Sequence, residues 1–461
     1  MMKRIDNNCS VFFYPVFILL FLYLIPAPVH PQDSDLLPAA EFAHRRTVFL
    51  EQMPDSSIAI FQAAEVKTRS SDVTYEYHQD NNFYYLTGVT APNTIFVLIK
   101  GGLKIEGNTV TEILFVPSKN PRGAMWDAAA ISAEDQIMAG FQLVKTSDTF
   151  QDVLQTLLPG KKLLFYSLSN EFLYEPVSEQ RIFVGRLAKK QLREKYPNLK
   201  VKSPNKIIYR QRQIKSPQEL QLMQKAIDMT CEAQIEAMRS AKPGMYEYQI
   251  EAVIEFIFKK NGAEYAAFPT IVGSGPNSTI LHYWQNRRQM QKGDLVVMDI
   301  GAEYHGYSAD VTRTIPISGK FTKKQRELYS IVVQAQKEVI AAVKPGVPFS
   351  ALNKIAKKVM ADAGYGKYFI HGVSHFLGLD THDVGPMKIL KPGMVLTVEP
   401  GIYIRESADI NKAYWNIGIR IEDDILVTEN GHKVLSTKAP REIDEIEKLM
   451  QKKTKLTVDF N

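Results

Sequence analysis

The chain has 461 residues, of which 45% are apolar and 23% charged, so it is long and apolar enough for two or three folded domains. Lys and Arg exceed Asp and Glu by only 56 − 50 = 6, which gives no reason to expect nucleic acid as a partner. The two cysteines, Cys9 and Cys231, exclude C-x-x-C zinc sites and a disulfide framework. The H-E-x-x-H, G-x-S-x-G and G-x-x-x-x-G-K-[ST] motifs are absent, so a hydrolase would need another source of nucleophile.

The first thirty residues have the pattern of an export signal. Lys3 and Arg4 precede the uncharged stretch 10–29, which contains a dense apolar run. About 20 uncharged residues can span a bilayer, so an uncleaved membrane anchor fits as well as a cleaved signal peptide; a buried core helix is a third interpretation. We expect an exported protein, periplasmic or extracellular, and favour cleavage of residues 1–29 over retention of an anchor through residues 10–29. Cleavage would remove a net charge of +1 and leave +5.

Residues 41–200 are predicted to form an α/β domain. Short apolar runs typical of strands alternate with helical stretches; strands are expected at 58–61, 94–99, 112–116 and 162–166, and helices at 40–53 and 179–196. The basic stretch 189–206 is interpreted as a solvated helix face that leads into an interdomain linker.

A second domain is expected over residues 207–461, and it begins with helices. Ser216 is a good N-cap, Pro217 fits the first helical position and Glu219 completes a capping box. These signals predict a helix from there to about residue 240, followed by another over 246–260.

Two aspartates on neighbouring strands are the first candidates for chemistry. Residues 294–300 (DLVVMDI) are predicted to form a buried strand and 309–317 (ADVTRTIPI) its partner. If the chain reverses near Tyr304-His305, Asp299 pairs directly with Asp310 and both carboxylates lie on one face. Two carboxylates that close repel each other unless protons or cations lie between them, and two divalent metals would use both.

Histidines and another carboxylate follow in the same domain. Three of the nine histidines, His371, His375 and His382, fall within twelve residues. Neutral imidazole is a common metal ligand and moves protons near neutral pH. Glu399 stands at the end of the apolar run 396–398, where a second strand is expected to deliver it.

Glu422 lies on a further predicted strand, residues 418–425. A period of two places Arg420 on the same face, where an arginine can hold the glutamate charged and oriented. Four carboxylates and one histidine on apolar strands suit two oxygen-preferring metals. Carboxylate-dominated ligation favours Mn²⁺, while Zn²⁺, Co²⁺ and Fe²⁺ stay open.

Together these segments resemble the Xaa-Pro aminopeptidase (aminopeptidase P) family of metallopeptidases, which is related to prolidase and methionine aminopeptidase. The resemblance extends from about Glu41 to the C-terminus. The family's motifs occur in order as 280–283 (ILHY), 299–301 (DIG), 307–314 (YSADVTRT), 371–378 (HGVSHFLG), 398–401 (VEPG) and 420–423 (RIED).

The resemblance implies an α+β pita-bread catalytic domain with an antiparallel sheet, preceded by an α/β domain with a mostly parallel or mixed sheet. The first domain would serve oligomerisation, as a dimer or tetramer, and help to enclose the substrate. The resemblance also implies two divalent metal ions, held by Asp299, Asp310, His375, Glu399 and Glu422. Further implied site residues are three substrate-contacting histidines, His282, His371 and His382, and Arg420 near Glu422.

The activity that the resemblance implies is removal of the N-terminal residue from X-Pro-Y peptides by a hydroxide that bridges the two metals. Glu399 would shuttle a proton to the leaving nitrogen, and His371 and His382 would stabilise the developing oxyanion. Asp299 would help to orient the free α-amino group. Because an X-Pro amide has no N–H, specificity would come from the ring and the free amine.

Two other functions use the same residues. A prolidase, which cleaves only X-Pro dipeptides, shares the metal set, but prolidase-like sequences tend to carry Gly where this chain has Ser374. A non-catalytic peptide-binding protein of this fold would have lost ligands, whereas all five are present here. The chain departs from the common family pattern after His282, with Tyr-Trp-Gln-Asn, and in shorter loops at 364–371 and 386–392, which leaves substrate length and subunit contacts open.

Overall fold

The computed structural model describes residues 35–105, 107–118, 140–167, 172–175 and 180–456. The predicted signal peptide or anchor, residues 1–29, lies outside these ranges. Among the described residues, no helix has the length and apolar character needed to cross a membrane.

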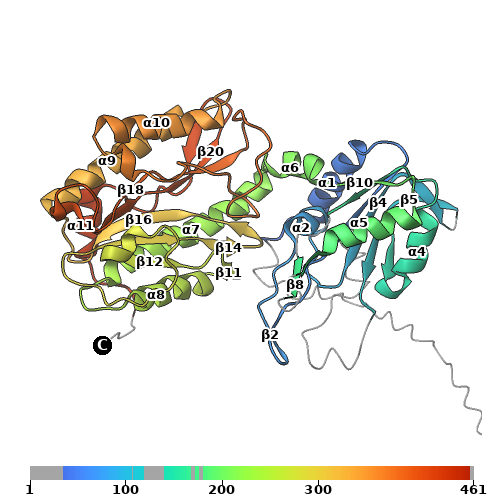
Figure 1. Ribbon diagram of the computed structural model, residues 1–461, viewed down its shortest axis with the longest axis horizontal. Coiled ribbons are helices and arrows are strands. Elements are labelled where there is room, and N and C mark those ends of the chain that lie inside the picture. The colour runs from blue at the N-terminus through green and yellow to red at the C-terminus, as the bar shows by residue number, and fades with distance from the viewer. Residues whose placement is uncertain (1–34, 106, 119–139, 168–171, 176–179, 457–461) are drawn as a thin grey trace, which may run out of the picture. The chain divides into compact units, whose positions relative to one another are not determined.

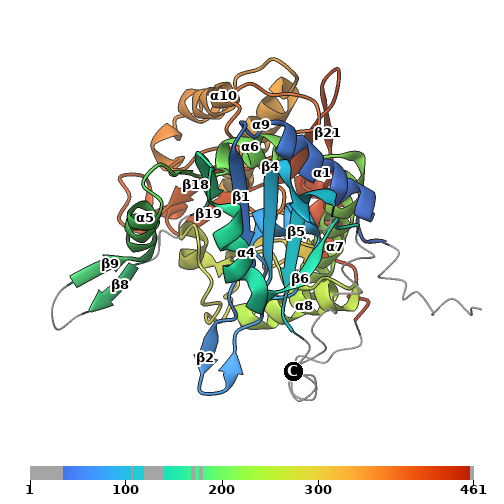
Figure 2. The same cartoon turned by 90° about the vertical axis from the view of Figure 1, so that its right-hand side faces the viewer.

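The N-terminal α/β domain is built on a six-stranded mixed sheet with the order β10-β7-β1-β4-β5-β6. Its strands are β1 (Ser57–Gln62), β4 (Ile95–Ile105), β5 (Asn108–Val116), β6 (Val144–Thr146), β7 (Leu163–Tyr166) and β10 (Lys200–Lys202). Figure 2 shows β1, β4, β5 and β6 side by side. The helices are α1 (Ala39–Glu51), α2 (Asn81–Thr87), α4 (Phe150–Leu157), α5 (Val184–Lys195) and α6 (Asn205–Arg212). The four predicted strands are confirmed as β1, β4, β5 and β7.

Central strand β1 is buried on both faces because alternate side chains enter two different apolar clusters. Ile58 and Ile60 pack in the cluster that includes residues of α4 and α5, while Ala59 and Phe61 pack with Phe49 of α1. Two short hairpins extend from this domain: β2 (Thr68–Ser70) with β3 (Val73–Thr74), and β8 (Phe172–Glu175) with β9 (Gln180–Phe183). The expected helix over 179–196 is therefore wrong at its start, because residues 180–183 pair with β8 and the helix begins at Val184.

The C-terminal domain places antiparallel strands between two pairs of helices. In Figure 1, α7 (Pro217–Ser240) and α8 (Glu247–Lys260) lie on one side of the strands, and α9 (Lys323–Ala342) and α10 (Phe349–Asp362) on the other. The first half contains β11 (Tyr265–Ala266), β12 (Ile271–Ser274), β13 (Leu295–Ile300), β14 (Ala302–Tyr304), β15 (Tyr307–Ser308) and β16 (Val311–Pro316). The second half contains β17 (Val395–Val398), β18 (Gly401–Ile404), β19 (Ile417–Arg420), β20 (Asp423–Val427), β21 (His432–Val434) and α11 (Ile443–Met450).

Helix α7 begins where the capping signals predict. The Ser216 side chain accepts a hydrogen bond from the Glu219 backbone N–H, and the Glu219 side chain accepts one from the Ser216 N–H. Residues of α7 are buried against the N-terminal domain as well as strand β16, since Leu222 and Ile227 share one apolar cluster with Phe42 and Val311. This long helix therefore supports the strands that carry the aspartates.

The hairpin that carries Asp299 and Asp310 has a register different from the predicted one. Asp299 lies opposite Thr312, and the chain reverses at His305-Gly306, one residue later than expected. Both turn residues have positive φ, 49° and 80°, which is the geometry of a two-residue type I′ turn with glycine at its second position. Direct pairing of Asp299 with Asp310 is therefore wrong, and the two aspartates are diagonal neighbours. A shift of two residues keeps both on one face, because the side-chain period of a strand is two.

Gly301 of the DIG motif has a steric role at this crossing. A Cβ atom at this position would lie 1.9 Å from the backbone oxygen of Ala309 on the returning strand. Any larger residue would push apart the two strands that present Asp299 and Asp310.

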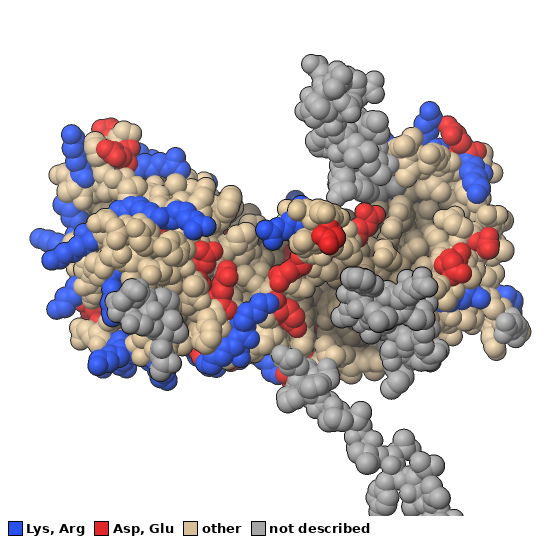
Figure 3. All heavy atoms as spheres, turned by 90° about the horizontal axis from the view of Figure 1, so that it is seen from below, with Lys and Arg blue, Asp and Glu red and all other residues tan. Residues whose placement is uncertain are grey.

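Charges of both signs cover the face shown in Figure 3, where Lys and Arg side chains lie beside Asp and Glu side chains. This mixture agrees with the small net charge of the chain, +6.

The two domains also meet through a histidine–carboxylate contact. His78, between β3 and α2, has Nε2 2.9 Å from Oε1 of Glu303 on β14, and its ring lies against Tyr265. The hydrogen bond to Glu303 raises the pKa of His78 above its usual value near 6.5, although partial burial acts in the opposite direction. The protonated form therefore stabilises the folded chain.

This contact predicts a dependence of stability on pH. The contribution of His78 is fully present below about pH 6.5 and is lost as pH rises through the raised pKa. We expect wild type to exceed His78→Gln in unfolding free energy by about 0.5 kcal/mol at pH 6, since half-exposed pairs are weak, and by less at pH 9. Urea unfolding at both pH values measures this, and an unchanged difference would contradict the assignment.

Candidate metal centre

Four of the five predicted ligands lie together: three carboxylates surround the imidazole ring of His375. Nε2 of His375 lies 3.4 Å from Oδ2 of Asp310, 3.6 Å from Oε1 of Glu399 and 4.0 Å from Oε1 of Glu422. One ligand atom each from Asp310, His375 and Glu422 lies within 4.8 Å of the other two. Asp310 directly precedes β16 and Glu399 directly follows β17, so strand ends deliver both.

Asp299, the fifth predicted ligand, is held by Arg420 and lines the same pocket as Asp310. The Nη2 of Arg420 donates to Oδ2 of Asp299 at 2.6 Å, and its Nη1 donates to the Tyr403 hydroxyl at 2.9 Å. The pairing of Arg420 with Glu422 that the strand period predicts is wrong, because the ion pair of Arg420 goes to Asp299. Arg420 does lie near Glu422, since both side chains bond the Thr312 hydroxyl.

Arg420 and Glu422 do not pair with each other because they do not lie on the same strand. Strand β19 ends at Arg420 and β20 begins at Asp423, so the single strand expected over 418–425 is wrong. Glu422 instead bonds with Thr312 of β16, whose hydroxyl donates to Oε2 at 2.7 Å and whose carbonyl accepts from the Glu422 N–H at 3.0 Å. Thr312 thus holds the carboxylate that Arg420 was expected to hold.

The His375 ring has a defined orientation. Its Nδ1 lies 3.0 Å from the backbone oxygen of Phe376, which can only accept, so Nδ1 carries the proton. Nε2 of the same ring faces the oxygens of Asp310, Glu399 and Glu422. Metal-bound histidines are commonly oriented by such a bond from the other ring nitrogen.

The donor set fits divalent cations. Among the described residues, Oδ1 of Asp299, Oδ1 of Asp310 and Oε1 of Glu422 are buried carboxylate oxygens with no hydrogen-bond donor. Burial, together with the charges of neighbouring carboxylates, raises the pKa of Asp310 and of Glu422 well above the usual range. Buried carboxylate oxygens without hydrogen-bond donors, grouped beside an imidazole nitrogen, are a favourable environment for divalent cations.

His371 lies beside Glu399 and is fully engaged by its neighbours. Its Nδ1 donates to the Gly372 carbonyl at 2.8 Å and its Nε2 is hydrogen-bonded to the Tyr403 hydroxyl at 2.9 Å. Burial, with the charge of Arg420, lowers the pKa of His371 to about 4, so the ring is neutral at pH 7. Burial raises the pKa of Glu399 to about 7, against the opposing charges of His375 and Arg420.

The other two predicted histidines line a pocket of about 460 Å³. His282 and His382 share its wall with Asp299 and Asp310, and the rest of the wall is largely apolar, formed by Ala267, Phe268, Pro269, Ile271, Trp284, Asp380 and Thr381. The His382 ring is stacked on His375, with 4.0 Å between centroids and 18° between planes. Burial lowers the pKa of His382, aided by the nearby His375. A peptide end can thus reach the carboxylates through an apolar entrance.

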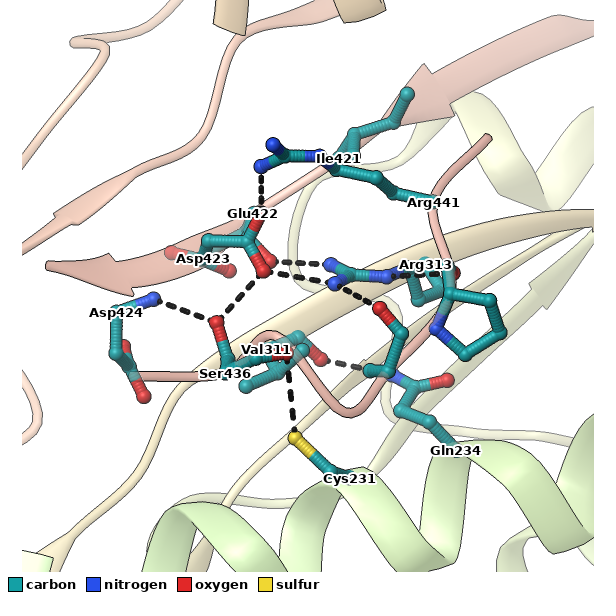
Figure 4. Close-up of polar contacts among 12 residues, drawn as sticks. Cys231, Gln234, Val311, Arg313, Ile421, Glu422, Asp423, Asp424, Ser436 and Arg441 are labelled. Carbon is teal, nitrogen blue, oxygen red and sulfur yellow. Dashed lines mark hydrogen bonds and ion pairs between the residues drawn. The ribbon is translucent and has the colours of Figure 1, made fainter. Parts of the chain in front are cut away.

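A buried ion network lies directly behind the ligands (Figure 4). Arg313 donates to both the Glu422 carbonyl, at 2.5 Å, and Oδ1 of Asp423, at 2.7 Å. The Asp423 carboxylate also accepts from Ser436 and Arg441, each at 2.6 Å. These contacts join β16 to β20 and hold the backbone of Glu422 in place.

The sequence reasoning missed Thr312, Arg313 and Tyr403 as parts of the site. A period of two from Asp310 would have placed Thr312 on the same face, within the already recognised motif 307–314. No sequence pattern would have identified Tyr403. Its contact with His371 exists only because β18 pairs with β19 and lies opposite His371 in the fold.

Antiparallel strands between two helix layers, with a carboxylate-rich cation site in a pocket, define a metallohydrolase of the pita-bread class. Residues 221–429, which include all five predicted ligands, match the model of metallopeptidase family M24. Residues 42–166 match that of the aminopeptidase P N-terminal domain. The chain belongs to the M24 metallopeptidases and carries the N-terminal domain of aminopeptidase P.

Curated and solved relatives agree with this assignment. An Xaa-Pro aminopeptidase of Escherichia coli is 36% identical over 439 residues, covering 89% of this chain and 97% of that protein. An Xaa-Pro dipeptidase of Pyrococcus furiosus is 41% identical, but only over 235 residues, 50% of this chain and 64% of that protein. The structure of aminopeptidase P from E. coli with the inhibitor Pro-Leu matches with a TM-score of 0.81 at 34% identity, over 90% of this chain and 98% of that one.

Proposed function

We propose that the protein is an Xaa-Pro aminopeptidase, which removes the N-terminal residue from peptides that have proline in second position. The observation that carries the proposal is the His375 ring, whose Nε2 faces the carboxylates of Asp310, Glu399 and Glu422. The relative of nearly equal extent in E. coli has this activity in its name, and 97% of its length is matched.

The proposed cofactor is a pair of divalent cations, held by Asp299, Asp310, His375, Glu399 and Glu422. When bound, such cations lower the pKa of water and polarise the scissile carbonyl group. We propose Mn²⁺ as the native metal, because four of the five ligands are carboxylates. Metal analysis of the purified protein decides among Mn²⁺, Zn²⁺, Co²⁺ and Fe²⁺.

The roles of the chain's own residues follow from where they lie. The Glu399 carboxylate, 3.7 Å from His371 and 3.6 Å from His375, is the proposed proton carrier to the leaving nitrogen. His282 and His382 line the pocket and are proposed to contact the substrate. Both ring nitrogens of His371 already have partners, so we propose that it positions Glu399 through its ring.

Prolidase activity is the alternative that shares this metal set. The N-terminal match to the aminopeptidase P domain favours the aminopeptidase, because the dipeptidase relative is matched over only half of this chain. A direct comparison of X-Pro with X-Pro-Y as substrates separates the two activities. Faster hydrolysis of the dipeptide than of the tripeptide would assign the protein as a prolidase.

Removal of metal gives the first test of the chemistry. We expect EDTA to abolish hydrolysis of an X-Pro-Y peptide and added Mn²⁺ to restore it, because bound divalent cations would activate the water that attacks the scissile carbonyl group. A parallel X-Ala-Y peptide serves as the specificity control and should be a poor substrate. Full activity in excess EDTA, with no bound metal, would assign the fold to a different function.

Export and assembly are further parts of the proposal. Lys3 and Arg4 before the uncharged stretch 10–29 support export with a cleaved signal or a retained anchor. Cell fractionation and N-terminal sequencing of the mature protein distinguish these two states. The resemblance to the family supports a dimer or tetramer, which light scattering on the full chain measures.

A further inference from the structure

A buried ion network holds the loop that carries His382. The side chain of Asp383, the next residue, is 1% exposed and has both carboxylate oxygens engaged. Its Oδ1 accepts from Nη2 of Arg212 at 2.7 Å, and its Oδ2 accepts from Nζ of Lys215 at 2.8 Å. Arg212 ends α6 and Lys215 precedes α7, so the connection between the two domains supplies both cations.

The loop has little freedom to move around this network. The Asp383 N–H donates to the Phe376 carbonyl at 2.8 Å, which ties the two ends of the loop together. A Cβ atom on Gly378 would lie 2.2 Å from Oδ2 of Asp383 and 2.9 Å from Cε of Lys215. The glycine of the motif 371–378 is therefore required because the ion pair fills the adjacent space.

The same arginine reaches the N-terminal domain. Nη1 of Arg212 donates to Oδ1 of Asn82 on α2 at 2.8 Å, and Nη2 also bonds Oδ2 of Asp380 at 2.6 Å. Nδ2 of Asn81 donates to Oδ1 of Asp380 at 2.7 Å and to the Leu379 carbonyl at 3.0 Å. Asn81 of α2 thus holds the beginning of the loop directly, and Asn82 of α2 holds Arg212. Arg212 bonds both Asp380 and Asp383, and Lys215 bonds Asp383.

The position of His382 depends on this support. Its ring is stacked on His375 and forms part of the pocket wall, so a loop displacement of about 1 Å would change its distance to a bound peptide. Neither Arg212 nor Lys215 lines the pocket. Both can act on the reaction only through the loop.

We propose that Arg212 and Lys215 are positioning residues for His382, and that the N-terminal domain contributes to catalysis by holding Arg212 through Asn82. The proposal rests on the proposed function only for its kinetic readout. It assigns to the N-terminal domain a role within a single subunit.

A double-mutant cycle tests the proposal in the metal-loaded full chain. We expect Arg212→Met to lower kcat for an X-Pro-Y peptide by about tenfold with bound metal unchanged, the usual scale for residues that orient a catalytic group. In the His382→Ala background, Arg212→Met should lower kcat by less than about twofold, because the imidazole that Arg212 positions is gone. Equal losses in both backgrounds would overturn the proposal.

Arg46→Met is the matched control. Arg46 is equally buried and pairs with Glu112 at 2.8 Å inside the N-terminal domain. We expect its effect on kcat to be the same with and without His382. If Arg212→Met does not fold, Asn82→Ala is used instead, because it removes one hydrogen bond to Arg212 and keeps the ion pairs. We expect Asn82→Ala to lower kcat by about threefold, and by less in the His382→Ala background.

A readout without catalysis separates failure of this proposal from failure of the proposed function. The imidazole NMR resonances of His382, assigned by their loss in His382→Ala, should shift in Arg212→Met and stay unchanged in Arg46→Met. Unchanged His382 resonances in Arg212→Met would refute the positioning role even if wild type hydrolyses X-Pro-Y. An inactive wild type with the expected shift would overturn the proposed function alone.

Discussion

Replacing His375 with alanine is expected to lower kcat/KM for an X-Pro-Y peptide by roughly 10³-fold. Bound metal stabilises the transition state of such reactions by several kcal/mol, and the variant would lose much of that stabilisation. Nε2 of this imidazole faces all three of Asp310, Glu399 and Glu422, and loss of the ring leaves three carboxylates that repel each other. We therefore expect metal content to fall together with activity. Metal analysis and steady-state kinetics on the same preparation measure both.

Two companion variants make this result specific. His432→Ala is the control, because His432 also bonds a backbone carbonyl, that of Val343 at 2.9 Å, but lies on β21. It should retain wild-type turnover. Glu399→Ala should lose turnover as His375→Ala does, and near wild-type rates in metal-loaded His375→Ala or Glu399→Ala would falsify the ligand assignment.

The second large effect is expected on stability, from Asp423→Asn. This carboxylate accepts hydrogen bonds from Arg313, Arg441 and Ser436 in the buried network behind the ligands (Figure 4). The amide keeps the shape of the side chain but removes the negative charge that compensates Arg313, which is 0% exposed. We expect the free energy of unfolding to fall by about 3–5 kcal/mol.

Asp444→Asn is the surface counterpart of this variant. Asp444 is 92% exposed and pairs with Arg326 at 3.2 Å, so its loss should cost less than about 1 kcal/mol. Denaturant unfolding of both metal-free variants compares them directly. If Asp423→Asn cost no more than Asp444→Asn, the network would have no role in holding β16 against β20.

Local patterns predicted several of the elements, and together with the family's motifs they supplied the candidate site residues. The capping box at Ser216 predicted the start of α7, and apolar runs predicted β1, β4, β5 and β7. Motifs with several chemically constrained positions, such as 371–378, identified the segments that the structure brings together around His375. These features depend on neighbours in sequence, which a linear pattern records.

Three expectations failed because each depended on which part of the chain a strand or side chain meets in the fold. The hairpin register depended on which two residues adopt positive φ, and Gly306 moved the turn by one residue. The partner of Arg420 depended on a strand break at Glu422 that apolar alternation does not reveal. Residues 180–183 became a strand because β8 offers them a pairing edge.

The sequence by itself determined which residue types are present for chemistry: carboxylates and histidines on apolar strands, without a serine elbow or a pair of structural cysteines, and with an overall charge of only +6. Tertiary structure alone decided which groups orient them. Thr312 holds Glu422, Tyr403 joins His371 to Arg420, and Arg212 holds Asp383 across 171 residues of chain. Such contacts are set by packing between distant segments, where a buried charge must find a partner wherever the fold supplies one.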